Sequence, residues 1–175
     1  MAKIKIFRAI PELCTGCDMC TITCSLTKTG KVNPSSARIR IDRSGGHEFP
    51  QPIICRHCKK PSCLAACRVE GAMHLDRETG AVVINEAKCV RCLDCMNACP
   101  FGAIQVSPVG EMLKCDLCGG DPVCIKHCSP RPERSLPLFP YPKASCLEYV
   151  EPDRLTRKLA HRSVSPLVHK EAANG

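Results

Sequence analysis

The clearest alternation of apolar and polar residues in this chain lies between residues 72 and 85. Here "AMHLD" (72–76) alternates and "AVVIN" (81–85) is rich in β-branched residues, while "RETG" (77–80) has the composition of a turn. This pattern predicts a β-hairpin. A further short apolar segment, "PFGAIQV" (100–106), predicts another strand.

The C-terminal part of the chain follows a different pattern. After the proline-rich stretch at 129–145, "CLEYV" (146–150) predicts a delayed strand that follows an inserted extended loop. Beyond it, Leu155 and Leu159 recur at helical spacing after an N-cap residue at Asp153, which predicts a short amphipathic helix. That helix either covers its own domain or clasps a neighbouring subunit. We favour docking, because proline-rich and basic extensions suit it.

Large apolar side chains are scarce along the whole chain. The 175 residues include no Trp, two Tyr and four Phe, whereas 17 are Cys. A chain with so thin a core needs cohesion from disulfides or from metal centres. No run of about 18 apolar residues occurs, so we expect no membrane span.

Three features favour metal centres over disulfides. The N-terminal stretch "MAKIKIFRAIPELC" has no apolar signal core, so we expect a cytoplasmic protein, and a reducing cytoplasm disfavours structural disulfides. The number of cysteines is odd. Their spacings also repeat locally, as metal-site spacings do.

The cysteines are arranged in four groups of four, with Cys146 left over. The groups are Cys14, Cys17, Cys20 and Cys24; Cys55, Cys58, Cys63 and Cys67; Cys89, Cys92, Cys95 and Cys99; and Cys115, Cys118, Cys124 and Cys128. Groups one and three are compact, whereas groups two and four are expanded between their second and third cysteines. Pro61 and Pro122 stand two residues before the third cysteine of each expanded group. The alternation suggests a duplicated two-group unit.

The compact spacing points to a particular chemistry. "CVRCLDCMNACP" (89–100) has the Cys-x2-Cys-x2-Cys-x3-Cys-Pro spacing that binds 4Fe–4S clusters in bacterial ferredoxins, with the fourth cysteine directed at a neighbouring cluster. Four groups therefore predict four 4Fe–4S clusters. Zinc is the alternative metal, but structural zinc typically takes four cysteines from two separated pairs.

Exchange of the fourth cysteine between paired groups predicts the ligands of each cluster. Residues 53–107 have the pattern of an ordinary two-cluster ferredoxin, so group two pairs with group three, and the flanking groups one and four pair with each other. The predicted sets are Cys14, Cys17, Cys20 and Cys128; Cys115, Cys118, Cys124 and Cys24; Cys55, Cys58, Cys63 and Cys99; and Cys89, Cys92, Cys95 and Cys67. Sequential pairing, of one with two and three with four, is the alternative.

This pairing predicts an α+β fold made of two pseudo-symmetric ferredoxin-like modules, each holding two clusters. The inner module is continuous and spans residues 53–107. The outer module combines residues 1–52, which carry the first cysteine group, with residues 108–150, which carry the fourth group and the proline-rich insertion. Residues 151–175 form the C-terminal helix and docking tail.

Electron transfer is the function that this arrangement favours. Every predicted cluster has four thiol ligands, so no iron is left open for a substrate, and we assign no catalytic residue. The chain also lacks a phosphate loop and a GxGxxG turn. The alternatives are a diffusible polyferredoxin, a catalytic iron–sulfur enzyme and a zinc-rich interaction module.

The net charge of +8 first suggests nucleic acid or an acidic partner. Four oxidised clusters with their thiolates add about −8, however, and bring the loaded protein close to neutral. The basic residues are dispersed and stacking aromatics are scarce, so nucleic-acid binding is not expected. Some basic residues near the cysteines are expected to favour the reduced clusters, and the rest to be solvated surface. The candidates are Arg56, Lys59, Lys60, Arg68, Arg91 and Lys114.

Across residues 3–128 the four-group arrangement resembles the iron–sulfur subunits of large redox enzymes. These include the dimethyl-sulfoxide-reductase family, formate dehydrogenases, hydrogenases, tungsten aldehyde oxidoreductases and benzoyl-CoA reductases. The short length and "KCDLCGGDPVCIKHC" (114–128) are most similar to the small iron–sulfur subunit of a tungsten aldehyde oxidoreductase. The resemblance implies a larger tungsten- or molybdenum-pterin catalytic partner and a second, FAD-containing partner that reduces NAD. Clusters at both ends of the chain would also allow copies to associate.

The chain departs from the ferredoxin pattern after most of its groups. Ser25, Arg68 and Ser129 stand where ferredoxins often have proline, and only Pro100 is kept. Cys146 is expected in the delayed strand, as a buried structural thiol and not as a seventeenth ligand, because the four sets are already full.

Overall fold

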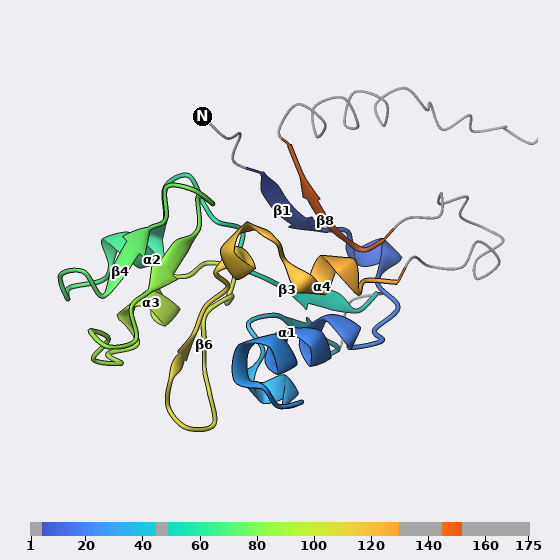
Figure 1. Cartoon of the computed structure of the whole chain (residues 1–175), viewed down its shortest axis with the longest axis horizontal. Coiled ribbons are helices and arrows are strands. Elements are labelled where there is room, and N and C mark those ends of the chain that lie inside the picture. The colour runs from blue at the N-terminus through green and yellow to red at the C-terminus, as the bar shows by residue number, and fades with distance from the viewer. Residues whose placement is uncertain (1–4, 45–48, 130–144, 152–175) are drawn as a thin grey trace, which may run out of the picture.

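Short strands and short helices alternate along the computed structural model, which describes residues 5–44, 49–129 and 145–151. The longest helix is α1 (Met19–Thr29), and α2 (Ser62–Ala65), α3 (Asp94–Asn97) and α4 (Val123–Lys126) have four residues each. This mixture, seen in Figure 1, confirms the α+β class. The predicted insertion and the predicted tail helix lie outside the described residues, apart from the ends of the insertion.

The strands of the described residues form four separate antiparallel pairs. They are β1 (Ile6–Ala9) with β8 (Leu147–Val150), β2 (Arg40–Asp42) with β3 (Gln51–Ile53), β4 (Met73–Leu75) with β5 (Val82–Ile84), and β6 (Gln105–Val106) with β7 (Met112–Leu113). Such short ladders bury little apolar surface by themselves, so they depend on what they pack against.

The predicted hairpin is confirmed as the β4–β5 pair, and the residues of its turn explain its shape. The Asp76 carboxylate accepts hydrogen bonds from the Glu78 backbone N–H at 2.9 Å and from the Thr79 hydroxyl at 2.7 Å. Gly80 closes the turn with a φ of 74°, a conformation that glycine adopts without strain. The predicted strand at 100–106 is confirmed at its end, as β6.

The pair β1–β8 joins segments that are far apart in the sequence. Phe7 lies opposite Tyr149, with their ring centroids 6.5 Å apart in an edge-to-face arrangement. The Arg8 guanidinium and the Glu148 carboxylate form an ion pair at 2.6 Å. The delayed strand is thus confirmed, with one correction: Cys146 stands immediately before β8 and not within it.

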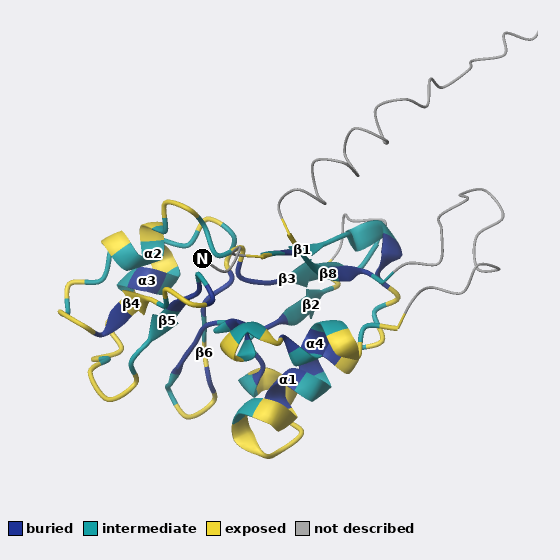
Figure 2. Ribbon diagram, turned by 45° about the horizontal axis from the view of Figure 1, so that its top comes forward, coloured by how far each residue is buried: buried dark blue, intermediate teal, exposed yellow. Residues whose placement is uncertain are grey.

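Two apolar clusters form the core, and cysteines contribute to both. One gathers around Phe7, Ile39 and Leu117, and the other around Val82 and Ile104. In the first, α1 packs on α4, and in the region of the second, α2 packs on α3. Figure 2 shows that the first turns of α1 carry buried residues while its last turn is exposed.

Helix α1 has well-defined ends. Asp18 precedes it in a left-handed conformation, and at its other end the Gly30 N–H donates to the Leu26 carbonyl at 2.9 Å with a φ of 71°. No helix within residues 5–44, 49–129 and 145–151 combines the length and the apolar character needed to cross a membrane.

Candidate metal centres

Four cavities in the described part of the chain are each lined by four grouped cysteines, and we name each after one of them. The Cys14 cavity is lined by Cys14, Cys17, Cys20 and Cys128; the Cys115 cavity by Cys24, Cys115, Cys118 and Cys124; the Cys55 cavity by Cys55, Cys58, Cys63 and Cys99; and the Cys89 cavity by Cys67, Cys89, Cys92 and Cys95. Their volumes, with the open space at their mouths included, are similar, at about 350, 330, 400 and 350 Å³.

The structure therefore brings group one together with group four, and group two together with group three. Helix α1 carries Cys20 into the lining of the Cys14 cavity and Cys24 into that of the Cys115 cavity. On the opposing α4 side the order is reversed, because Cys124 lines the Cys115 cavity and Cys128 lines the Cys14 cavity. Two packed helices thus serve two cavities.

The same crossing recurs at α2 and α3. Cys63 on α2 lines the Cys55 cavity, and Cys67, just beyond the helix, lines the Cys89 cavity. Cys95 on α3 lines the Cys89 cavity, and Cys99 lines the Cys55 cavity. In every cavity, three cysteines of one group meet the last cysteine of another.

The backbone before the second cysteine of every group is left-handed. Gly16, His57, Arg91 and Leu117 occupy this position, with φ values of 69°, 44°, 59° and 57°. Only the first is a glycine, and the other three adopt a conformation that costs about 1–2 kcal/mol for a residue with a side chain. Such strain persists where the surroundings require it and clusters at functional sites. The sequence gives no sign of it at His57, Arg91 or Leu117.

Burial keeps several of the thiols protonated when no metal is bound. It raises the pKa of Cys20 and of Cys115 to about 12, and it also raises the pKa of Cys24 and Cys124. Backbone N–H groups point at two of the crossing cysteines: Arg38 N–H lies 3.3 Å from Cys24 Sγ, and an equivalent contact reaches Cys99. Binding a metal would therefore exchange protons for positive charge at these sulfurs.

Buried nitrogen atoms without a hydrogen-bond partner lie beside two of the cavities. Both ring nitrogens of His57, in the Cys55 cavity, lack a hydrogen-bond partner, as does Arg38 Nη1 in the Cys115 cavity. Burial, together with the nearby Lys114 ammonium, lowers the pKa of His57 to about 4, so the ring is neutral at pH 7. Orphaned donors are costly unless an acceptor is present. Together with four thiols per cavity, they fit a sulfur-rich, anionic metal cofactor.

The four cysteines of each quartet line a cavity of about 330 to 400 Å³. Four thiolates on one zinc ion, with bonds of about 2.3 Å, would lie roughly 3.8 Å from one another. Among residues 5–44, 49–129 and 145–151, no group of three or more Cys, His, Asp or Glu side chains is arranged to hold a single metal ion.

Cys146 is a fifth cysteine at the Cys14 cavity. Its side chain is buried, as predicted, and its thiol is within hydrogen-bonding contact of both Cys14 and Cys128. These hydrogen bonds lower the pKa of Cys14 and Cys128 and raise that of Cys146, which therefore remains a protonated donor. The backbone fixes its place, because Ile10 N–H donates to the Cys146 carbonyl at 2.8 Å.

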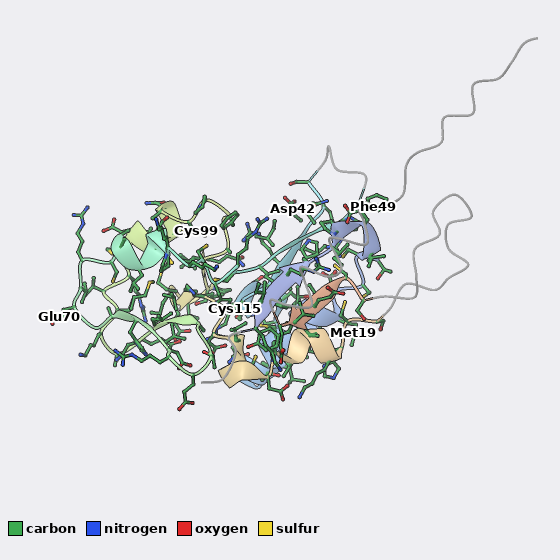
Figure 3. The ribbon with its side chains drawn as sticks, turned by 90° about the horizontal axis from the view of Figure 1, so that it is seen from above. Met19, Asp42, Phe49, Glu70, Cys99 and Cys115 are labelled. Atoms are coloured by element: carbon green, nitrogen blue, oxygen red, sulfur yellow. The ribbon has the colours of Figure 1, made fainter. Side chains whose placement is uncertain are left out.

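The cavities follow one another along the molecule. The Cys14 and Cys115 cavities share α1 and α4, and the Cys55 and Cys89 cavities share α2 and α3. The two pairs of cavities adjoin at Cys55 and Cys115, since the charge of Cys55 acts to raise the pKa of Cys115. Figure 3 shows Cys115 near the middle of the molecule, between Cys99 on one side and Met19 on the other. The two exposed cysteines, Cys17 and Cys92, lie in the first and last cavities of this series.

One of the six basic residues singled out by sequence lies deep in the structure. Lys114 is 5% exposed and lines the Cys55 cavity. Arg56 also lines this cavity, but it is exposed and stacks on Phe101, with 4.1 Å from the guanidinium carbon to the ring centroid. Arg68 pairs with Asp94 at the surface. The remaining three, Lys59, Lys60 and Arg91, are exposed.

Comparisons with known proteins agree with these four cysteine-lined cavities. Residues 47–133 match the family model described as a 4Fe-4S dicluster domain. The polyferredoxin-like subunit of an aliphatic sulfonate oxidoreductase from Pyrococcus furiosus is 41% identical over 123 residues, which cover 67% of this chain and 68% of that protein. The B subunit of the anaerobic dimethyl sulfoxide reductase of Escherichia coli is 34% identical over 148 residues, which cover 73% of this chain and 69% of that protein.

A solved structure resembles this chain more weakly. The active site complex BamBC of benzoyl coenzyme A reductase, as isolated, aligns over 93% of this chain and 89% of that protein, with 20% identity and a TM-score of 0.46.

Proposed function

This chain belongs to the family of ferredoxin-like iron–sulfur subunits with a 4Fe-4S dicluster domain, and we propose that it relays electrons through four 4Fe–4S clusters. When bound by four thiolates, such a cluster accepts and returns one electron. The observation that carries the proposal is the lining of each cavity by three cysteines of one group and the last cysteine of another.

We propose that each cavity holds one cluster on its four lining cysteines. The ligand sets are then the four quartets named above for the Cys14, Cys115, Cys55 and Cys89 cavities. The repeated left-handed residue before each second cysteine supports this, because it gives four equivalent loops. The role of the chain is to hold these sulfurs, to exclude water from them and to set the charge around them.

The same quartets support the two-module organisation. The inner ferredoxin-like module is residues 53–107, and the outer module joins residues 1–52 to residues 108–150, with residues 151–175 as a tail that docks on a partner. Pseudo-symmetry between the modules is supported by the crossing of cysteines at α1 and α4 and again at α2 and α3.

Iron analysis tests the clusters directly. The full chain, purified without oxygen, is expected to contain about sixteen iron and sixteen sulfide ions, four of each per cluster. Zinc in place of iron would reject the proposal in favour of a zinc-binding module. Substrate-induced change in one cluster's EPR spectrum would favour a catalytic iron–sulfur enzyme instead.

For the catalytic partner we propose a tungsten- or molybdenum-pterin oxidoreductase acting in the cytoplasm. An aldehyde oxidoreductase is our first candidate, with an FAD subunit that passes electrons to NAD. The relative from Pyrococcus furiosus belongs to an aliphatic sulfonate oxidoreductase, which makes sulfonates the second candidate substrate class. Formate dehydrogenase, hydrogenase and benzoyl-CoA reductase complexes are the remaining alternatives.

Native purification separates these partners. The complex isolated through a tag on this chain is expected to contain a larger subunit with tungsten or molybdenum. Reduction of the clusters by aldehydes alone, by aliphatic sulfonates alone, or by neither, then identifies the substrate class. A chain that elutes by itself from fresh extract would instead be a diffusible polyferredoxin, or would associate only with copies of itself.

A further inference from the structure

Lys114 places a positive charge inside the protein, against a cysteine of the Cys55 cavity. It follows β7 directly and is 5% exposed. Its Nζ lies 3.4 Å from Cys55 Sγ and also donates a hydrogen bond to the Val82 carbonyl. The second contact holds the ammonium group inside the protein, beside the sulfur.

The charge of Lys114 has no carboxylate partner among the described residues. The ion pairs found in residues 5–44, 49–129 and 145–151 involve other side chains. A buried cation without a counter-charge is strongly unfavourable. The Cys55 thiolate and the negative charge of a bound cluster would supply that counter-charge.

The cations near the other cavities are different. Beside the Cys115 cavity, Lys28 is paired with Asp116 at 2.6 Å and Arg38 with Glu86 at 3.7 Å, so acidic groups offset their charges. At the Cys14 cavity, Arg43 is half exposed and is paired with Asp18.

The Cys89 cavity differs in another way, since no charged side chain lines it. Its lining, apart from the cysteines, consists of Val69, Ala72, Met73, Ile84, Val90, Leu93 and Met112. Of the four cavities, the Cys55 cavity therefore has the only buried cation that no carboxylate offsets within the described residues.

We propose that Lys114 makes the cluster of the Cys55 cavity the first of the four to be reduced. This inference rests on the proposed function, because it requires the clusters. Positive charge and hydrogen bonds to the sulfurs favour the reduced state of a cluster. One electron takes the core from 2+ to 1+, and no bond or proton changes place. The orphaned ring of His57 adds a second donor at the same cavity.

The consequence is an electron reservoir inside the series of clusters. The Cys55 cavity stands between the Cys115 cavity and the Cys89 cavity, so an electron from either end reaches it before leaving. The exposed cysteines, Cys17 and Cys92, belong to the two cavities at the ends. An electron that enters at either end is thus held away from solvent until the partner at the other end accepts it.

The test is a redox titration of the full, cluster-loaded chain followed by EPR, with redox mediators as the electron donors. Lys114→Met removes the charge and keeps a side chain of similar length, and Lys114→Arg keeps the charge. Lys126→Met is the matched control, because Lys126 is 54% exposed and already pairs with Asp121. A Cys58→Ser variant identifies the signal of the Cys55 cavity.

In Lys114→Met, the oxidised-to-reduced ratio of the highest-potential cluster at fixed solution potential is expected to rise at least tenfold, about 59 mV for one electron. Lys114→Arg is expected to restore most of the wild-type value. The control is expected to change no cluster by more than about threefold, because its charge is screened by solvent. Equal shifts in all four clusters, or no shift in Lys114→Met, would overturn the inference.

A measurement on the wild-type chain covers the case in which Lys114→Met does not retain its iron. Lysine labelled with 15N at Nζ is incorporated, and the first cluster to be reduced is examined by pulsed EPR. A coupled 15N nucleus is expected, and its absence would reject the inference. If the wild-type chain itself lacks 4Fe–4S clusters, the proposed function fails; if the clusters are present but insensitive to Lys114, only this inference fails.

Discussion

Cys20 and Cys24 lie one turn apart on α1, yet they line different cavities. Cys20 faces the Cys14 cavity, and Cys24 faces the Cys115 cavity, where Arg38 N–H contacts its sulfur. A helix places residues four apart on one face, so these two side chains can reach two sites only if the sites adjoin. The Cys14 and Cys115 cavities therefore adjoin along α1.

Single removals of crossing cysteines test this arrangement. Cys24→Ala and Cys124→Ala are expected to abolish the same EPR signal and to lose about four of sixteen irons each. Cys14→Ala and Cys128→Ala are each expected to abolish a second EPR signal, the same one in both variants. If Cys24→Ala instead removed the signal lost in Cys14→Ala, each group would hold its own cluster.

The pH dependence of cluster retention is expected to differ between two adjoining cavities. Burial raises the pKa of Cys115 to about 12 and raises that of Cys124, so both thiols are protonated in the unloaded chain at neutral pH. Hydrogen bonds from Cys146 lower the pKa of Cys14 and Cys128, which therefore have fewer protons to lose. Each proton released on loading changes the loading constant about tenfold per pH unit.

On acidification, the cluster of the Cys115 cavity should therefore be lost at a higher pH than that of the Cys14 cavity. EPR spectra recorded between about pH 8 and pH 5 in the presence of a chelator would measure both in one sample. A Cys146→Ala variant provides the control, since it is expected to bring the two transitions closer together. Loss of both clusters at one pH in the wild type would contradict the prediction.

The left-handed backbone at Arg91 should lower the stability of the loaded protein by a measurable amount. Arg91 is exposed and has a φ of 59°, in the position that Gly16 occupies in the first group. Arg91→Gly is expected to stabilise the loaded protein by about 1 kcal/mol, and Arg91→Val to destabilise it by a similar amount. The midpoint temperature of cluster loss, followed by absorbance at a fixed heating rate, measures both.

Arg77→Gly is the matched control for this series. Arg77 is also exposed, but its backbone is outside the left-handed region, so glycine there is expected to lower stability slightly through the entropy of the unfolded chain. An increase in the midpoint for Arg77→Gly equal to that for Arg91→Gly would show that backbone strain is not the cause.

Much of the local structure could be predicted, because it depends on near neighbours in the sequence. The alternation at 72–76 and the Asp and Gly of the following turn are enough to specify the β4–β5 hairpin. The cysteine spacings likewise depend on short-range geometry, and the four quartets predicted from them are those that line the four cavities. Their role as ligands remains a prediction.

The long-range features were not predictable in the same way. The pairing of β1 with β8 depends on residues about as far apart as the described chain allows, and β7 as the partner of β6 has too few residues to show a pattern. Six basic residues near cysteines looked alike in the sequence, although only Lys114 is buried. Burial is a property of the assembled fold, so composition cannot separate them.

Cys146 offers the sharpest test of how a cysteine acts without being a ligand. Its thiol contacts Cys14 and Cys128 and remains a donor, while four other cysteines line the cavity. Cys146→Ala is expected to keep about sixteen irons, but to lower the potential of the Cys14-cavity cluster alone, because a hydrogen bond that favours its reduced form is removed. Cys146→Ser, with a stronger donor, is expected to hold or raise that potential. If Cys146→Ala instead lost about four irons while Cys128→Ala kept all of its iron, Cys146 would be the ligand and Cys128 only its neighbour.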